Sequence, residues 1–149
     1  MKYNLKFSTQ VAVSAPEAWT WITSFAGITK EMAPYMRMST PKGVTDLSSV
    51  VVEPGKPMFR SWILLFGFIP FDYSDLTLLR LDDGVGFLEQ SPMGTMRLWR
   101  HERQITPNDP GSIIMDELTF EPRIVGPISQ RIVRAFFEHR HRNLARYLG

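Results

Sequence analysis

The sequence of 149 residues contains no cysteine, which excludes disulfide bonds, thiolate nucleophiles and metal sites with cysteine ligands. It has no long hydrophobic segment either. The longest apolar run, residues 62–71, has about half the length that a membrane-spanning helix needs, and Gly67 and Pro70 interrupt it. The first residues alternate between charged or polar and apolar types, where a signal peptide would have a continuous apolar stretch. We therefore expect a cytoplasmic protein without stable membrane insertion.

Several catalytic signatures are missing as well. The chain has no glycine-rich phosphate loop, no His-x-x-x-His pair with a third ligand and no Gly-x-Ser-x-Gly nucleophile turn. His139 and His141 are two residues apart, so on a helix they point to different sides and make a poor metal pair. The sequence therefore predicts neither a metal site nor a cofactor.

The composition is that of an ordinary globular domain, with 44% hydrophobic and 21% charged residues, and we expect residues 1–149 to form a single domain. The net charge of +2 is unevenly distributed, since residues 123–149 contain six arginines and one acid, Glu138. Most of these arginines fall on the polar side of the last helix, and this side lacks the interleaved aromatic residues of a single-strand binder. We interpret this side as a solvated exterior and expect no nucleic-acid partner.

Hydrophobic periodicity predicts the order of the elements. Residues 2–14 alternate as a half-buried strand does, and Ser14, Pro16 and Glu17 then form a capping sequence for a short helix. A second short helix should end at Met32, before Pro34. The rest reads as a short strand around residues 50–52, strands over about 58–66, 71–82, 86–91, 95–106 and 112–122, and a helix over 126–148.

This order and four local phrases resemble the START-like, or SRPBCC, helix-grip superfamily, including its polyketide cyclase/dehydrase-like branch. The phrases are Val13–Trp19, Trp99–Arg103, Asp116–Pro122 and Phe136–Arg140. The resemblance implies an α+β fold in which a curved antiparallel sheet of about six or seven strands wraps around the long C-terminal helix, with two short helices after the first strand. It also implies an apolar cavity that binds lipids, steroids, polyketides or similar molecules.

The strands on either side of residues 107–110 predict a pair of polar residues. If these four residues form the turn, His101 lies opposite Asp116 and Arg100 lies opposite Glu117. The face with His101 and Asp116 is the more apolar one and should face the cavity. A carboxylate beside an imidazole suits acid–base catalysis or ligand orientation, but it also suits a buried structural pair.

Arg140 lies in the middle of the apolar stripe of the last helix. A buried arginine needs a carboxylate, a carbonyl or a ligand anion, and Asp116, Asp75 and Glu89 are candidate partners. The alternative is that the end of the helix overhangs the sheet, so that the Arg140 side chain reaches water.

The apolar run 62–71 needs a lid, a dimer partner or a membrane surface for its second face. Tyr73 and Asp75, on one face of the following strand, form a further possible polar pair. The methionines at 32, 36, 38, 58, 93, 96 and 115 offer adjustable volume for a cavity, although methionine is also common core filling.

We therefore predict that the protein binds a hydrophobic small molecule between the sheet and the C-terminal helix. The alternatives are a cyclase- or dehydratase-like enzyme that uses the same cavity, and an interaction module that forms a homodimer through residues 62–71. The predicted catalytic residues are His101, Asp116 and, as a proton donor, Tyr73. The predicted ligand-binding residues are Arg140, Trp99, Leu118, Phe120, Val133, Phe136, Phe137 and Trp62.

Overall fold

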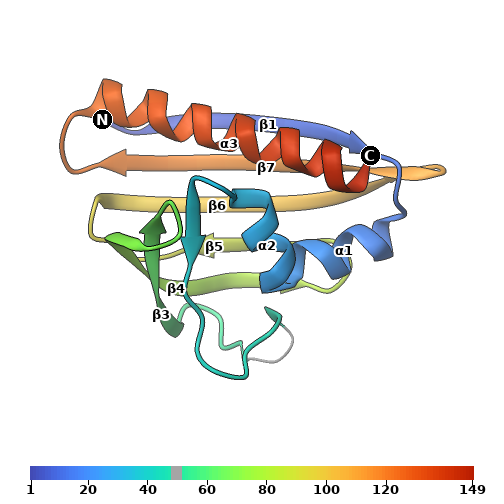
Figure 1. Cartoon of the computed structure of the whole chain (residues 1–149), viewed down its shortest axis with the longest axis horizontal. Coiled ribbons are helices and arrows are strands. Elements are labelled where there is room, and N and C mark those ends of the chain that lie inside the picture. The colour runs from blue at the N-terminus through green and yellow to red at the C-terminus, as the bar shows by residue number, and fades with distance from the viewer. Residues whose placement is uncertain (48–51) are drawn as a thin grey trace.

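A computed structural model describes residues 1–47 and 52–149 and contains one antiparallel sheet of seven strands. The strand order is β1-β7-β6-β5-β4-β3-β2, so β1 at one edge pairs with the last strand of the chain. Figure 1 shows helix α3 lying along β1 and β7, with α1 and α2 beside it. The elements are β1 (Tyr3–Val11), α1 (Ala15–Thr23), α2 (Phe25–Met32), β2 (Met36–Met38), β3 (Pro57–Leu65), β4 (Ile69–Asp82), β5 (Gly86–Gln90), β6 (Met96–Asn108), β7 (Gly111–Pro122) and α3 (Gly126–Leu148).

This architecture confirms the predicted α+β helix-grip fold, in which a curled sheet holds the long C-terminal helix. The junction between β1 and α1 forms as the sequence indicates, because the Ser14 side chain accepts a hydrogen bond from the Glu17 backbone N–H. Ser24 caps α2 in the same way through the N–H of Gly27. These two caps turn the chain twice after β1 and bring α2 against α3.

The buried apolar residues form two clusters. One lies where α1 and the C-terminal end of α3 meet the sheet and includes Ile22, Ile114 and Leu144. The other lies under the first half of α3 and includes Leu118, Phe120 and Phe137. Between them the inner face carries a group of buried charged side chains, which are described below.

The pairing of β6 with β7 differs from the prediction by two residues. The turn consists of Asp109 and Pro110 alone, since Asn108 still pairs with Gly111. The strand continues through Pro107, although proline has no N–H to donate. It is tolerated there because β5 pairs with β6 only as far as Gln104, so no hydrogen bond to β5 is lost at Pro107. Gly111 is required in this turn, because a Cβ there would lie 2.1 Å from the carbonyl oxygen of Val11.

The corrected register has a limited effect. Arg103 replaces His101 as the residue opposite Asp116, His101 lies opposite Leu118, and Trp99 lies opposite Phe120. A shift of two residues leaves every side chain on its predicted face, so His101 and Asp116 still share the inner face. The predicted pair of Arg100 and Glu117 is wrong, since Arg100 lies opposite Thr119.

Strand β2 was not predicted. It is three residues long and alternates too briefly for a periodic signal, and it forms because it pairs with the end of β3. The strand predicted around residues 50–52 falls largely outside the described residues.

Candidate ligand-binding cavity

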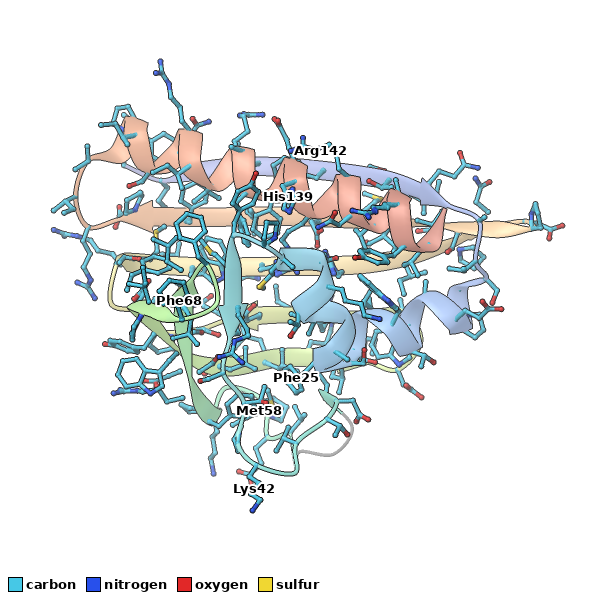
Figure 2. The ribbon with its side chains drawn as sticks, in the orientation of Figure 1. Phe25, Lys42, Met58, Phe68, His139 and Arg142 are labelled. Atoms are coloured by element: carbon cyan, nitrogen blue, oxygen red, sulfur yellow. The ribbon has the colours of Figure 1, made fainter. Side chains whose placement is uncertain are left out.

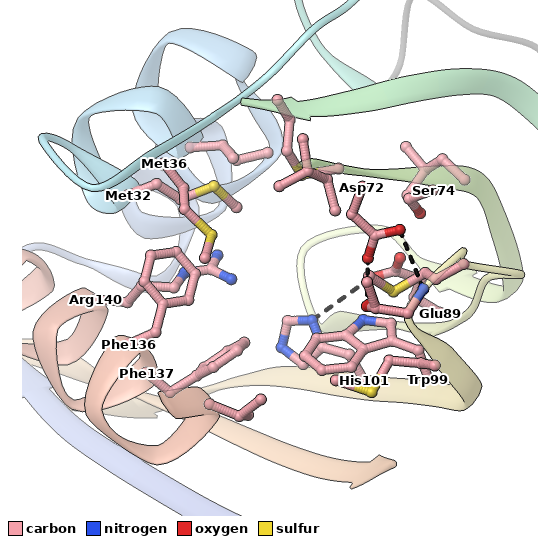
Figure 3. A pocket seen from close by; sticks show the side chains of 18 of the residues that line it. Met32, Met36, Asp72, Ser74, Glu89, Trp99, His101, Phe136, Phe137 and Arg140 are labelled. Carbon is pink, nitrogen blue, oxygen red and sulfur yellow. Dashed lines mark hydrogen bonds and ion pairs between the residues drawn. The ribbon is translucent and has the colours of Figure 1, made fainter. Parts of the chain in front are cut away.

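A cavity of about 520 Å³ lies between the inner face of the sheet and the helices α2 and α3. The walls come from distant parts of the chain, and Figure 3 shows Met32 and Met36 on one side, Phe136 and Phe137 on α3, and Trp99 on the sheet. Most of the lining is aliphatic, aromatic or thioether. Five of the seven methionines singled out in the sequence line it, namely Met32, Met36, Met38, Met93 and Met96.

Buried charged side chains form the polar part of the lining and the layer behind it. Asp116 on β7 is the centre of this network. Its two oxygens accept a bidentate pair from Arg103, with Nε 2.7 Å from Oδ1 and Nη2 2.8 Å from Oδ2. His101 Nε2 lies 2.6 Å from Oδ1, and His141 Nε2 lies 2.7 Å from Oδ2. Four donors therefore occupy the roughly four acceptor positions of one carboxylate.

Glu31 on α2 is the second anion of the network, and its side chain is fully buried. Arg103 Nη1 lies 2.8 Å from Oε1 of Glu31, and Arg140 Nε on α3 donates to Oε2 at 3.0 Å. A second contact joins Arg140 Nη2 to the same Oε2. Glu31 thus connects β6 to α3, and the Arg140 guanidinium also lies over the ring of Phe137 at 4.7 Å.

This environment shifts three ionisable groups. Burial alone would raise the pKa of Asp116, but the charges of Arg103 and His101 and their hydrogen bonds hold its pKa well below the usual range. Burial alone would lower the pKa of His101, but Asp116 and Glu89 outweigh it and the pKa of His101 is raised. The pKa of Arg103 is raised because Asp116 and Glu31 outweigh the cost of its burial. Each of these three shifts favours the charged form of the group.

Two further carboxylates lie on the sheet wall of the cavity, where Figure 3 shows Asp72, Ser74 and Glu89. Asp72 is held by its surroundings, since Oδ1 accepts from the N–H groups of Tyr73, Gly94 and Thr95 and Oδ2 accepts from the Thr95 hydroxyl. Glu89 is less constrained. Its Oε2 accepts from Ser91 at 2.7 Å, and its Oε1 lies 3.6 Å from His101 Nδ1, which is beyond hydrogen-bond distance.

The cavity brings together only part of the predicted site. Arg140, Trp99, Val133, Phe136, Phe137 and His101 line it. Asp116 lies one layer behind, bonded to His101. Leu118 and Phe120 are fully buried in the cluster under α3 and do not line the cavity.

Tyr73 and Trp62 lie away from the cavity. Trp62 is 47% exposed and its ring lies 6.1 Å from that of Tyr73, with the Arg60 guanidinium 4.3 Å from the Tyr73 ring. Strand alternation explains this arrangement, because Asp72 and Ser74 point inward and Tyr73 between them must point outward. Asp75, on the same outer side, pairs with Arg60 at 2.8 Å.

The expected partners of Arg140 are wrong, although its inward position is as the helical stripe indicates. Asp116 binds Arg103, Asp75 binds Arg60 and Glu89 binds Ser91, while Glu31 binds Arg140. Glu31 stands next to Met32 at the end of a short helix, and no local pattern distinguishes it from a solvent-exposed residue.

His141 was not predicted to be buried, but its side chain is buried and its Nδ1 lies 2.6 Å from the Thr9 hydroxyl oxygen. The apolar residues Ile132 and Tyr147 of the same helix are about half exposed, so the buried face of α3 is rotated away from them and towards His141. Arg131, Arg134, Arg142 and Arg146 are exposed as expected. Figure 2 shows Arg142 pointing away from the sheet.

The apolar run 62–71 forms the β3–β4 hairpin, and its tip is open to solvent, with Phe68 73% exposed. Figure 2 shows Phe68 at the turn of this hairpin. Among the described residues, no helix is long and apolar enough to cross a membrane.

Comparisons with known proteins agree with this fold. Residues 9–148 match a family described as a domain of unknown function, DUF8410. No curated protein matches the chain.

Three solved structures resemble the chain over most of its length. Protein CV1439 from Chromobacterium violaceum is 11% identical, with 97% of this chain and 96% of that chain covered and a TM-score of 0.73. A START superfamily protein from Mycobacterium smegmatis is 10% identical, with 97% and 96% covered and a TM-score of 0.69. DynU16, a protein in the dynemicin biosynthetic locus, is 14% identical with a TM-score of 0.64, and 97% of this chain covers 46% of it. These similarities establish the START-like fold.

Proposed function

The chain belongs to the DUF8410 family and has a START-like fold, and we propose that it binds a hydrophobic small molecule, such as a lipid or a polyketide, in the cavity under α3. The observation that carries the proposal is the cavity itself. Its volume of about 520 Å³ lies within the range of roughly 300–1,000 Å³ that is typical of small-molecule sites. We further propose that residues 1–149 act as one domain, because both walls of the cavity are needed to enclose the ligand.

The buried charges support a binding role. Glu31, Arg103 and Arg140 tie α2 and α3 to the sheet on one side of the cavity, so the space between these elements is held open by ion pairs. The side chains around empty apolar space lose van der Waals contacts, and a ligand that fills the space supplies these contacts.

A fluorescent apolar probe tests this proposal. N-phenyl-1-naphthylamine should bind the wild-type protein with increased emission, and Val133→Trp should reduce this binding because the indole occupies the cavity beside Phe137. Ala135→Trp is the matched control, since Ala135 is exposed on the same helix. Native mass spectrometry of protein purified from its own host would identify a natural ligand. Equal probe binding by wild type and Val133→Trp would refute the proposal.

A second candidate is a cyclase- or dehydratase-like enzyme in which His101 and Asp116 perform acid–base chemistry. It is favoured by one observation, the position of His101 in the cavity wall with a carboxylate 2.6 Å behind it. Asp116 already accepts four hydrogen bonds, so it can orient His101 but has no free acceptor position for a substrate proton. His101 would then act alone, as an acid through Nδ1.

The two candidates make different predictions for His101→Gln. If the protein only binds ligands, His101→Gln keeps the affinity for apolar probes, and neither the wild type nor the variant shows turnover. An enzyme keeps its affinity and loses turnover, and the pH–rate profile loses the limb that belongs to the imidazole.

A further inference from the structure

Arg140 and Glu89, two residues of the cavity wall, each have one polar side-chain atom without a hydrogen-bond partner in the described part of the chain. Arg140 Nε and Nη2 bind Glu31, but Nη1 of Arg140 has no hydrogen-bond partner among residues 1–47 and 52–149. The same holds in this described part of the chain for Oε1 of Glu89, whose nearest cation, His101 Nδ1, is 3.6 Å away. Both residues line the cavity.

Neither atom is sealed inside the protein. Within the described ranges, the buried side-chain atoms that are cut off from solvent and lack a hydrogen bond are Glu31 Oε1 and Ser74 Oγ only. Glu31 Oε1 faces Arg103 Nη1 at 2.8 Å, so it is part of an ion pair. Since Arg140 and Glu89 are themselves buried, the open space that their free atoms reach is the cavity.

The two atoms have opposite hydrogen-bonding roles and come from opposite elements of the fold. Arg140 Nη1 on α3 is a donor, and Glu89 Oε1 on β5 is an acceptor. Figure 3 shows the two side chains on different sides of the space bordered by Phe137 and Trp99. A ligand that contacts both atoms must carry an acceptor and a donor, separated by an apolar body.

The charge of the site decides between a neutral and an anionic acceptor. The buried ionisable side chains of the described residues are four acids and four bases: Glu31, Asp72, Glu89 and Asp116, and His101, Arg103, Arg140 and His141. Even with both histidines protonated, this set has no net positive charge. A ligand carboxylate would therefore add an uncompensated buried negative charge, whereas a carbonyl or hydroxyl oxygen would not.

We propose that the cavity selects a neutral, oxygenated apolar molecule, with a carbonyl or ether-type oxygen on Arg140 Nη1 and a hydroxyl group that donates to Glu89 Oε1. This inference rests on the proposed binding function and narrows its ligand class. Free fatty acids and other simple carboxylates are the class that it disfavours.

The test uses three naphthalenes. 2-Acetyl-6-naphthol and 6-hydroxy-2-naphthoate carry substituents at the same two positions, and 2-ethylnaphthalene is the apolar reference without either polar group. Dissociation constants are measured by fluorescence titration at pH 7 for the wild type, Arg140→Met, Glu89→Gln and the control Arg134→Met, which changes an exposed arginine of the same helix. We expect Arg140→Met to weaken 2-acetyl-6-naphthol about 10-fold, as the loss of one charge-assisted hydrogen bond does, and to leave 2-ethylnaphthalene within about twofold. Glu89→Gln should also weaken the naphthol selectively.

In the wild type, 6-hydroxy-2-naphthoate should bind about 10-fold more weakly than 2-acetyl-6-naphthol, because it brings the additional buried charge. Tighter binding of the naphthoate would overturn the proposed neutrality, and an equal effect of Arg140→Met on all three probes would overturn the role of Arg140. If Arg140→Met does not fold, Glu31→Gln combined with Arg140→Gln removes both charges of the pair and is used in its place. Failure of every probe, including 2-ethylnaphthalene, to bind the wild type would instead overturn the proposed binding function.

Discussion

Replacement of Glu31 by glutamine should destabilise the protein strongly. The Glu31 side chain is fully buried and is the anion shared by Arg103 and Arg140, with contacts of 2.8 Å and 3.0 Å. Glutamine keeps the shape but removes the negative charge, so two buried guanidinium groups share one remaining carboxylate, Asp116, which contacts only Arg103 directly. Removal of one partner of a buried ion pair costs about 3–5 kcal/mol.

Urea denaturation followed by circular dichroism measures this loss. For a domain of this size, about 3–5 kcal/mol corresponds to a decrease in Tm of roughly 6–20 °C. Glu138→Gln is the control, because it makes the same chemical change at an exposed position of α3 and should alter the free energy of unfolding by less than about 0.5 kcal/mol.

A double variant separates the charge effect from a packing effect. Glu31→Gln with Arg140→Gln leaves one arginine and one aspartate, which still pair, so it should recover part of the lost stability. A loss of less than about 1 kcal/mol in Glu31→Gln, or a double variant no more stable than the single one, would refute the view that these ions join α2 and α3 to the sheet.

Three other predictions concern stability. The pKa of Asp116 is lowered in the folded protein, so its stabilising contribution is complete above the ordinary aspartate pKa of about 3.9 and is lost as the pH falls through the lower folded value. Asp116→Asn should therefore reduce the loss of stability between about pH 5 and 2, measured by urea denaturation. An unchanged pH profile would contradict the lowered pKa of Asp116. The pKa of His101 is raised in the folded protein, so its stabilising contribution is complete below about pH 6.5 and is lost as the pH rises through the higher folded value. His101→Gln should therefore flatten the dependence of stability on pH on the alkaline side. A wild type whose stability is constant there would show that the imidazole is not charged. Ser14→Ala should cost about 1 kcal/mol, seen as a Tm lower by roughly 2–4 °C, because the cap of α1 is lost; Ser8→Ala on the same β1–α1 segment serves as the control, and equal effects of both would argue against capping.

Local sequence patterns were sufficient for most of the fold. Alternation and capping residues predicted β1, α1 and the strands from β3 to β7, because each is long enough to bury a continuous face. Strand β2 escaped prediction since its three residues depend on β3 for their conformation. The β6–β7 turn was misplaced because Pro107 suggested a turn residue, and only the missing neighbour at this end of β6 allows proline in the strand.

The candidate site was less accessible from the sequence. His101, Asp116 and Arg140 stood out because polar residues on apolar faces are visible in a periodic pattern. Glu31 and His141 did not, because their burial depends on how α2 and α3 pack against each other and against β1. Arg103 was not singled out, because its position opposite Asp116 follows from the exact strand register, which was wrong by two residues.

The ion pairs of Glu31 also have a kinetic consequence. They connect residues that are 72 and 109 positions apart in the chain, so they form only after β6 and α3 have been positioned against α2. Interactions that form late contribute little to the folding transition state and mainly slow unfolding. The Glu31 pairs should therefore determine how long the assembled cavity persists before the chain opens, while the speed of folding depends on the hairpins of the sheet.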